Sequence, residues 1–161
     1  MSELITVNIS DARITSCPRT LVTYALGSCI GICLYDTLTK TGGLAHIMLP
    51  HFPDSASKEQ INRYADTCIP NIVKEMEIAG CARGRILAKI AGGAKMFQVA
   101  DDSAFGNIGQ RNIEAVKETL SNLQIRIVAQ DVGLNYGRTL YFYTETGEMT
   151  IKSFSQGTKT Y

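Results

Sequence analysis

The stretch that decides the fold is residues 21–51, LVTYALGSCIGICLYDTLTKTGGLAHIMLPH. It holds two runs rich in β-branched and other apolar residues on either side of the turn-forming sequence at 36–39, which is typical of a β-hairpin. Side chains alternate between the two faces of a strand. Ile30, Ile32 and Leu34 therefore share one face, and this apolar face is expected to lie in the hydrophobic core.

The rest of the chain predicts further strands and two helices. Alternating or β-branched segments predict strands at 4–9, 21–25, 29–35, 44–49, 86–90, 125–129, 139–144 and 149–152. An apolar stripe with helical period predicts one helix over 61–79, which Pro70 is expected to kink or divide, and a second helix over 113–123. We therefore predict a layered α+β fold, with a β-sheet sandwich layer and two main helices packed on one side.

Composition indicates one globular domain spanning residues 1–161. The chain is 45% apolar and 19% charged, with a net charge of +1. Nucleic-acid and membrane partners usually require a clustered basic excess, which this balance lacks, so neither nucleic-acid binding nor membrane insertion is expected. The N-terminal sequence does not resemble a signal peptide. With an odd number of cysteines, five, we expect a cytoplasmic protein with reduced thiols.

The hairpin brings a cysteine and a histidine together. If 36–39 forms its tip, Tyr35 pairs with Lys40, and Cys29 falls directly opposite His46. A thiol beside an imidazole is the arrangement that activates a cysteine nucleophile, and we expect a thiolate–imidazolium ion pair near neutral pH. Gly27 and Ser28 form a bend before Cys29, where free backbone N–H groups are able to face a substrate oxyanion.

The other cysteines and His51 have simpler interpretations. Cysteine is among the most buried residue types, and Cys33 and Cys68 are expected to pack in the core. Cys17 and Cys81 lie beside predicted loops and receive no role. His51 follows Pro50 and is expected at the surface.

A zinc site is the sharper alternative. Cys29, Cys33, His46 and His51 match the spacing of a Cys2His2 finger. That motif places its histidines on a helix, whereas these lie in and after a predicted strand. Two cysteines four residues apart in a strand are about 13 Å apart, at about 3.3 Å per residue, and two zinc-bound thiolates each lie about 2.3 Å from the metal. No metal is therefore expected.

Taken together, motifs along most of the chain resemble the chemoreceptor glutamine deamidases, the CheD family. These motifs are Thr23-x-x-Leu26-Gly27-Ser28-Cys29, Leu34-Tyr35-Asp36, Gly42-Gly43, His46-x-Met48-Leu49-Pro50, Tyr64-Ala65-Asp66, Gly92-Gly93-Ala94-x-Met96-Phe97, Ile108-Gly109-x-Arg111-Asn112, and the stretch from Asp131-x-Gly133 to Gly137-Arg138. Leu134 departs from the pattern, because a second glycine is expected after Gly133.

The resemblance implies hydrolysis of selected glutamine side chains in bacterial chemoreceptors to glutamate. It implies Cys29 as the nucleophile, His46 as the general base and acid, and Thr23 as a third polar member. It also implies a layered fold similar to the catalytic domain of deamidating bacterial toxins, and a CheC-type phosphatase as a partner. The implied chemistry needs no metal or organic cofactor.

Two other functions remain open at this point. One is a regulatory binding module that stimulates the phosphatase without catalysis, against which the intact set of Thr23, Cys29 and His46 argues. The other is a cysteine amidase or peptidase with another substrate, which uses the same pair of side chains.

Overall fold

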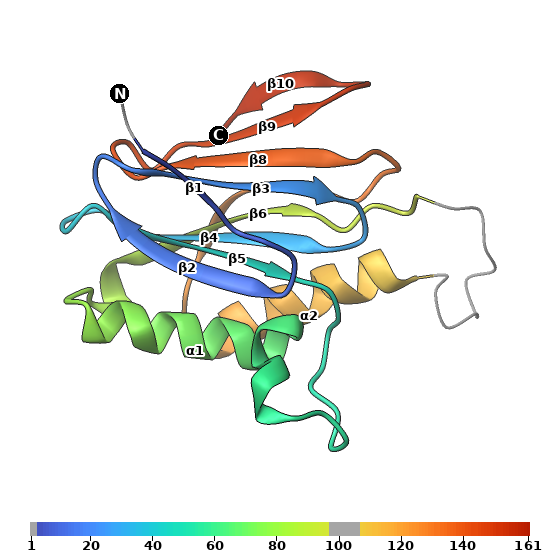
Figure 1. The fold of residues 1–161 in the computed structure, drawn as a ribbon, viewed down its shortest axis with the longest axis horizontal. Coiled ribbons are helices and arrows are strands. Elements are labelled where there is room, and N and C mark those ends of the chain that lie inside the picture. The colour runs from blue at the N-terminus through green and yellow to red at the C-terminus, as the bar shows by residue number, and fades with distance from the viewer. Residues whose placement is uncertain (1–2, 97–106) are drawn as a thin grey trace.

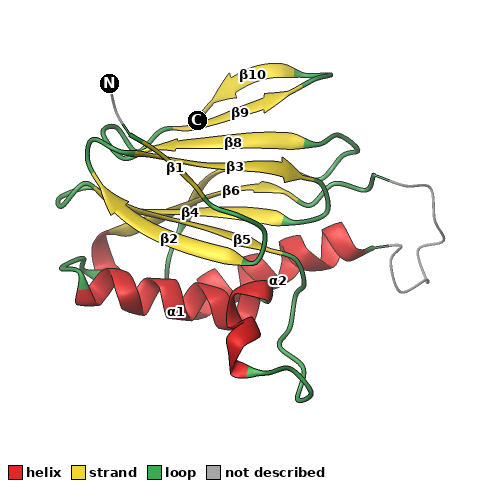
Figure 2. Cartoon of the chain, viewed as in Figure 1, coloured by secondary structure: helices red, strands yellow, loops and turns green. Residues whose placement is uncertain are grey.

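The molecule is built in three layers. A computed structural model describes residues 3–96 and 107–161 of the chain. In that part, two five-stranded sheets lie face to face, and the two main helices cover the outer face of one sheet (Figures 1 and 2). The predicted α+β fold, with helices on one side of a sheet sandwich, is confirmed.

The described strands and helices follow one another in a simple order. The strands are β1 Leu4–Thr6, β2 Asp11–Ser16, β3 Thr20–Leu26, β4 Ile30–Asp36, β5 Thr41–Ile47, β6 Ile86–Gly92, β7 Ile127–Val132, β8 Arg138–Tyr143, β9 Met149–Ser153 and β10 Gly157–Thr160. The helices are α1 Ala65–Ile78 and α2 Ile108–Asn122, with short 3₁₀ helices at Lys58–Arg63 and Arg83–Arg85. One sheet has the order β1-β3-β8-β9-β10, and the other has the order β2-β5-β4-β6-β7.

Strand β4 contributes to both hydrophobic cores. Ile30, Ile32 and Leu34 pack with α1 and α2, as the alternation predicts. Cys33 and Tyr35 point the other way, into the core between the two sheets. Every residue of β4 is buried because the strand lies in the middle layer, covered on both faces.

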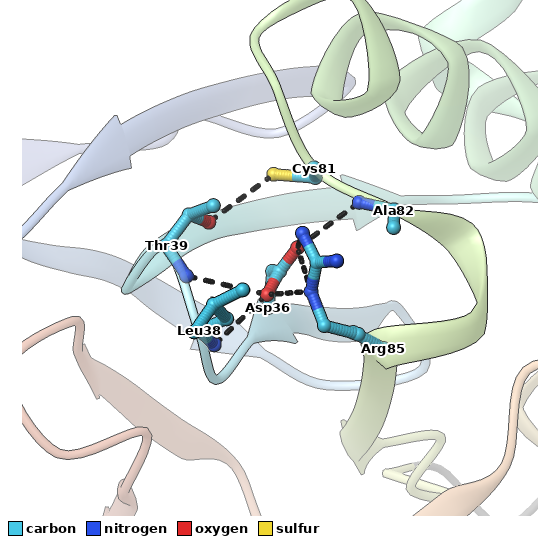
Figure 3. A network of polar contacts seen from close by, with 6 residues as sticks. All are labelled: Asp36, Leu38, Thr39, Cys81, Ala82 and Arg85. Atoms are coloured by element: carbon cyan, nitrogen blue, oxygen red, sulfur yellow. Dashed lines mark hydrogen bonds and ion pairs between the residues drawn. The ribbon is translucent and has the colours of Figure 1, made fainter.

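Asp36 determines where the β4–β5 turn begins. Its buried carboxylate accepts hydrogen bonds from the backbone N–H groups of Leu38 and Thr39 in the turn. It also accepts from the N–H of Ala82 and from the Arg85 guanidinium, which come from the connection between α1 and β6 (Figure 3). Burial by itself raises the pKa of Asp36, but the bonds from Arg85 and from the backbone hold it at about 2.

This arrangement corrects the predicted register of the hairpin. Asp36 is the last residue of β4 and pairs with Thr41, so the turn comprises residues 37–40 rather than 36–39. Tyr35 consequently pairs with Gly42 and not with Lys40. The difference is two residues, and a shift of two keeps every side chain on its predicted face.

The helical segment 61–79 is divided, but not at Pro70. Tyr64 is extended, with φ −117° and ψ 140°, and it separates the 3₁₀ helix at Lys58–Arg63 from α1. Pro70 lies inside α1, which continues without a break to Ile78. Cys68, Ile69 and Ile72 are buried around the proline, and their packing offsets the missing backbone hydrogen bond.

Two edge strands were not predicted. Strand β2 carries the mixed sequence DARITS and is only partly buried, and β10 carries the exposed sequence GTKT. Strand β2 has only two alternating apolar residues, Ala12 and Ile14, and β10 has none, so neither segment carries the longer apolar alternation on which a strand prediction rests. At the tip between β8 and β9, Gly147 has φ +81°, a left-handed conformation that favours glycine.

All five cysteines carry free thiols. Among residues 3–96 and 107–161, no helix has the length and apolar character needed to cross a bilayer.

Candidate active site

His46 is held by a hydrogen-bond chain that joins the two sheets. The imidazole Nδ1 of His46, on β5, lies 2.7 Å from Oγ1 of Thr23, on β3. The same Oγ1 donates to the backbone carbonyl of Val7, also at 2.7 Å. A threonine hydroxyl has one proton, and a carbonyl is only an acceptor, so the proton of Thr23 is committed to Val7.

This chain fixes the tautomer of His46. Because Thr23 has no second proton, its oxygen accepts a hydrogen bond, and Nδ1 of His46 is the donor. The neutral ring then carries its proton on Nδ1 and its lone pair on Nε2. Nε2 is buried and has no hydrogen-bond partner among the described residues. Burial lowers the pKa of His46 to about 4, so near neutral pH the ring is an uncharged base.

Cys29 lies just before β4, at the wall of a cavity. Its exposed fraction is 9%, and the cavity has a volume of about 430 Å³. The other lining residues are Ala25, Gly27, Ser28, Ala94, Lys95, Met96, Ile108 and Gly109. The thiol is therefore buried on the protein side while it borders a space large enough for a side-chain amide.

The backbone around Cys29 is clamped by two glycines at the end of β6. Gly93 donates its N–H to the Cys29 carbonyl at 2.9 Å, and Ala94 donates to the Gly27 carbonyl at 2.8 Å. Gly92 has φ +113°, and a Cβ at that position lies 2.1 Å from the Cys29 carbonyl oxygen. Only glycine fits such a close approach. In the sequence, Gly92 and Gly93 stand out only as part of a family motif, and nothing there indicates their contact with Cys29.

Cys29 and His46 are not directly opposite one another, which corrects the prediction. In the observed register His46 pairs with Gly31, and Ile30 pairs with Ile47. Cys29 is displaced by two residues along the same face, so the two side chains are diagonal neighbours. No hydrogen bond joins them in the described part of the chain. The cause is the turn at Asp36, which moves the pairing by two residues.

The expected ion pair is also absent among the described residues. Burial raises the pKa of the Cys29 thiol, although the backbone N–H of Cys29 itself acts in the opposite direction. Burial lowers the pKa of His46. Both shifts disfavour the charged forms, because neither side chain is solvated and they do not touch. The site is a neutral thiol near a neutral imidazole.

A bulge in β3 separates the two side chains. The β3–β8 register shifts between Thr23 and Leu26, and Ala25 within this bulge has φ +58°. Ala25 lines the cavity of Cys29 and also a second hollow of about 250 Å³, which His46 borders. A positive φ is costly for alanine, and such strain is concentrated at functional sites.

The remaining candidates lie elsewhere. Cys33 and Cys68 are buried in the two cores, as predicted. His51 is exposed, as predicted, and its Nδ1 lies 3.5 Å from the carboxylate of Asp66. No group of three or more His, Cys, Asp or Glu side chains suited to a metal occurs within residues 3–96 and 107–161.

Comparisons with known proteins show the family of this chain. The family model described as CheD chemotactic sensory transduction matches residues 48–153. The chain belongs to the CheD family. The "Chemoreceptor glutamine deamidase CheD" of Halalkalibacterium halodurans is 44% identical over 163 residues, covering 99% of each chain. The "Probable chemoreceptor glutamine deamidase CheD" of Lachnoclostridium phytofermentans is 43% identical over 159 residues, also covering 99% of each chain.

Leu134 stands where a glycine was expected, and it has φ +60°, in the left-handed region that favours glycine. Its carbonyl accepts a hydrogen bond from the N–H of Lys95, which lines the Cys29 cavity. A leucine therefore occupies a backbone conformation for which glycine is the usual residue. Phe97, which belongs to one of the CheD motifs, lies outside the described residues.

We predict that His46 makes the protein acid-sensitive. An unfolded histidine titrates near pH 6.5, whereas folded His46 titrates near pH 4, so its contribution to stability is complete above pH 6.5 and is lost as the pH falls to 4. Over this pH range the free energy of unfolding is expected to fall by about 3 kcal/mol. Urea denaturation across this range is expected to show a smaller loss in His46→Gln, while the exposed-site control His51→Gln follows the wild type. Equal losses in all three proteins contradict the assignment.

We predict that the Thr23 hydroxyl, and not the volume of its side chain, sets the state of His46. Thr23→Val leaves Val7 and His46 Nδ1 without a partner, which costs about 1–3 kcal/mol for each unpaired buried group. Thr23→Ser keeps the hydroxyl. Nitrogen-15 NMR of His46 is expected to report the Nδ1–H tautomer in the wild type and in Thr23→Ser, and a mixture in Thr23→Val. A wild-type spectrum in Thr23→Val excludes the proposed hydrogen-bond chain.

Proposed function

We propose that this protein hydrolyses the side-chain amide of selected glutamines in bacterial chemoreceptors, giving glutamate and ammonia. In this proposal Cys29 is the nucleophile, His46 is the general base and acid, and Thr23 orients His46. The observation that carries it is the buried Nε2 of His46, which keeps its lone pair and lies on the same strand face as the cavity-lining thiol of Cys29. The names of the CheD relatives supply the substrate class.

The first half of the reaction forms a thioester. Nε2 of His46 takes the proton of Cys29 as the sulfur attacks the carboxamide carbon of the glutamine. The backbone N–H of Cys29, which already faces its own sulfur, is placed to donate to the developing oxyanion. The imidazolium then returns the proton to the amide nitrogen. The carbon–nitrogen bond breaks, and ammonia leaves.

The second half consumes one water. Nε2 takes a proton from this water as its oxygen attacks the thioester carbon, and the carbon–sulfur bond breaks. The proton passes to the Cys29 sulfur, so the thiol and the neutral imidazole are restored. The sum is amide plus water to carboxylic acid plus ammonia. Every proton is carried by the protein or by water, and we therefore propose no metal or organic cofactor.

The mechanism requires Cys29 and His46 to meet. Gly31 lies opposite His46, and the side chains of Leu26 and Leu140 pack over it: a Cβ on Gly31 would lie 3.2 Å from Leu26 and 2.9 Å from Leu140. The face at Gly31 is therefore filled by these two leucines, and a side chain there would have to displace them. Catalytic hydrogen bonds are often long or missing without substrate, and tighten when it binds. Substrate in the Cys29 cavity is the event that we propose brings the thiol to Nε2.

The decisive experiment compares two cysteine variants on receptor substrates. The protein is incubated with chemoreceptors of the same organism, and glutamine-to-glutamate conversions are mapped by peptide mass spectrometry. Cys29→Ala is expected to abolish conversion and to fold normally, because alanine fits the site but supplies no nucleophile. Cys33→Ala is the matched control, buried on the same strand face, and it is expected to remain active with a small stability loss.

The outcomes separate the alternatives. An active Cys29→Ala with an inactive Cys33→Ala contradicts the nucleophile assignment. If the wild type converts no receptor glutamine but hydrolyses other amides or peptide bonds, the protein is a cysteine amidase or peptidase with another substrate. If it hydrolyses neither, the regulatory binding module is favoured.

We also propose a CheC-type phosphatase as a partner and the cytoplasm as the location. Both follow from membership of the CheD family, and the five free thiols suit a reducing compartment. Cys29→Ala is expected to bind such a phosphatase with wild-type affinity in calorimetric titration, because binding uses the surface and not the sulfur lone pair. Loss of binding by a well-folded Cys29→Ala protein indicates instead that the partner covers the active site.

A further inference from the structure

A buried asparagine on α2 joins the two segments that carry Cys29 and His46. Asn112 is fully buried, and its Nδ2 donates to the backbone carbonyl of Ser28 at 3.0 Å and to that of Met48 at 2.8 Å. Ser28 immediately precedes Cys29 in the sequence, and Met48 follows His46 by two residues. One side-chain amide therefore reaches both backbones.

The position of this bridge explains its effect. The β4–β5 ladder ends at the pair Ile30 and Ile47. Beyond that pair the two chains diverge, since Met48 donates its N–H to the Arg63 carbonyl and no longer to β4. Beyond the end of the ladder, the two hydrogen bonds from Asn112 hold these segments together next to Cys29, the proposed nucleophile.

The bond to Ser28 also controls a group in the site. The peptide unit between Ser28 and Cys29 is planar, so fixing its carbonyl fixes the direction of the Cys29 N–H. That N–H is the group that faces the Cys29 sulfur. A donor on the carbonyl further polarises the peptide and strengthens its N–H as a donor.

The free-energy cost of burying the Asn112 amide indicates a role beyond packing. Oδ1 of Asn112 is buried and has no hydrogen-bond partner among the described residues. An unpaired buried amide oxygen costs about 1–3 kcal/mol, which an apolar residue avoids. The opposite orientation of the amide places its oxygen against two carbonyl oxygens, so the assignment of Nδ2 as the donor is the favourable one.

We propose that Asn112 is a positioning residue, which holds the Ser28–Cys29 peptide and the end of β5 in the geometry that nucleophilic attack requires. It acts through these backbones and not on the substrate, because it is absent from the residues that line the Cys29 cavity in the described structure. The proposal rests on the proposed function, in which Cys29 attacks the glutamine amide.

The test compares Asn112→Ala with Val116→Ala. Val116 lies one turn further along α2 and is fully buried, so its truncation destabilises the same helix and leaves the amide bridge intact. Two quantities are measured in each variant: kcat and KM for receptor deamidation, and the rate of Cys29 alkylation by iodoacetamide without receptor, followed by peptide mass spectrometry.

In Asn112→Ala we expect kcat to fall by about 10²-fold, as for a misplaced reacting group, with KM near the wild-type value. Cys29 alkylation is expected to slow, because a displaced N–H no longer stabilises the thiolate. Val116→Ala is expected to keep the wild-type kcat and alkylation rate at a reduced stability. If Asn112→Ala fails to fold, Asn112→Ser replaces it and is expected to give the same losses, since its hydroxyl reaches one of the two carbonyls only.

The proposal is overturned if the Asn112 variant matches Val116→Ala in either kcat or alkylation rate, or if only KM changes. The alkylation measurement uses no receptor, so it decides the role of Asn112 even if the wild type proves inactive on chemoreceptors. Inactivity of the wild type contradicts the proposed function, whereas wild-type alkylation in Asn112→Ala contradicts the positioning role.

Discussion

The chemistry of the site depends on where one proton of Thr23 goes. The Val7 carbonyl takes it, the Thr23 oxygen becomes an acceptor, and the ring of His46 turns its protonated Nδ1 toward β3. The free Nε2 follows from this arrangement. This series of hydrogen bonds connects Val7, just after β1, with Thr23 on β3 and His46 on β5. Residues from both sheets therefore keep the lone pair of His46 Nε2 free. A sandwich is suited to this, since its middle space excludes the water that would compete for these bonds.

Burial keeps both reacting groups uncharged until a substrate arrives. A neutral thiol reacts slowly with oxidants and alkylating agents, because the thiolate is the reactive species. Burial thus protects the thiol, and in the proposed mechanism charge develops only as the sulfur attacks a bound substrate, when the backbone N–H of Cys29 donates to the oxyanion. Hydrogen bonds already hold the backbone around Cys29 in place. Gly93 donates to the Cys29 carbonyl, and Asn112 donates to the Ser28 carbonyl.

The layers and the faces of the hairpin could be predicted from the sequence, but the register could not. Alternation keeps Cys29 and His46 on one face for any even shift of the register, including the observed shift of two residues. The register depends on Asp36, whose partners Ala82 and Arg85 lie 46 and 49 residues away, beyond any local pattern. Thr23 was indicated by the family resemblance alone, because a threonine in a strand is ordinary. Val7 contributes only its backbone carbonyl, and the type of a residue does not show which group its backbone binds.

The carbonyl of Val7 comes from the end of β1, and this has a consequence for control of the enzyme. Strand β1 has three residues, lies at a sheet edge and is held by its parallel pairing to β3. Short edge strands detach more readily than the rest of a sheet. If β1 detaches, the Thr23 hydroxyl is free to donate a hydrogen bond to Nδ1 of His46, which favours the tautomer with the ring proton on Nε2. The position of one hydrogen atom on His46 thus depends on an N-terminal strand that lies outside the hairpin of Cys29 and His46.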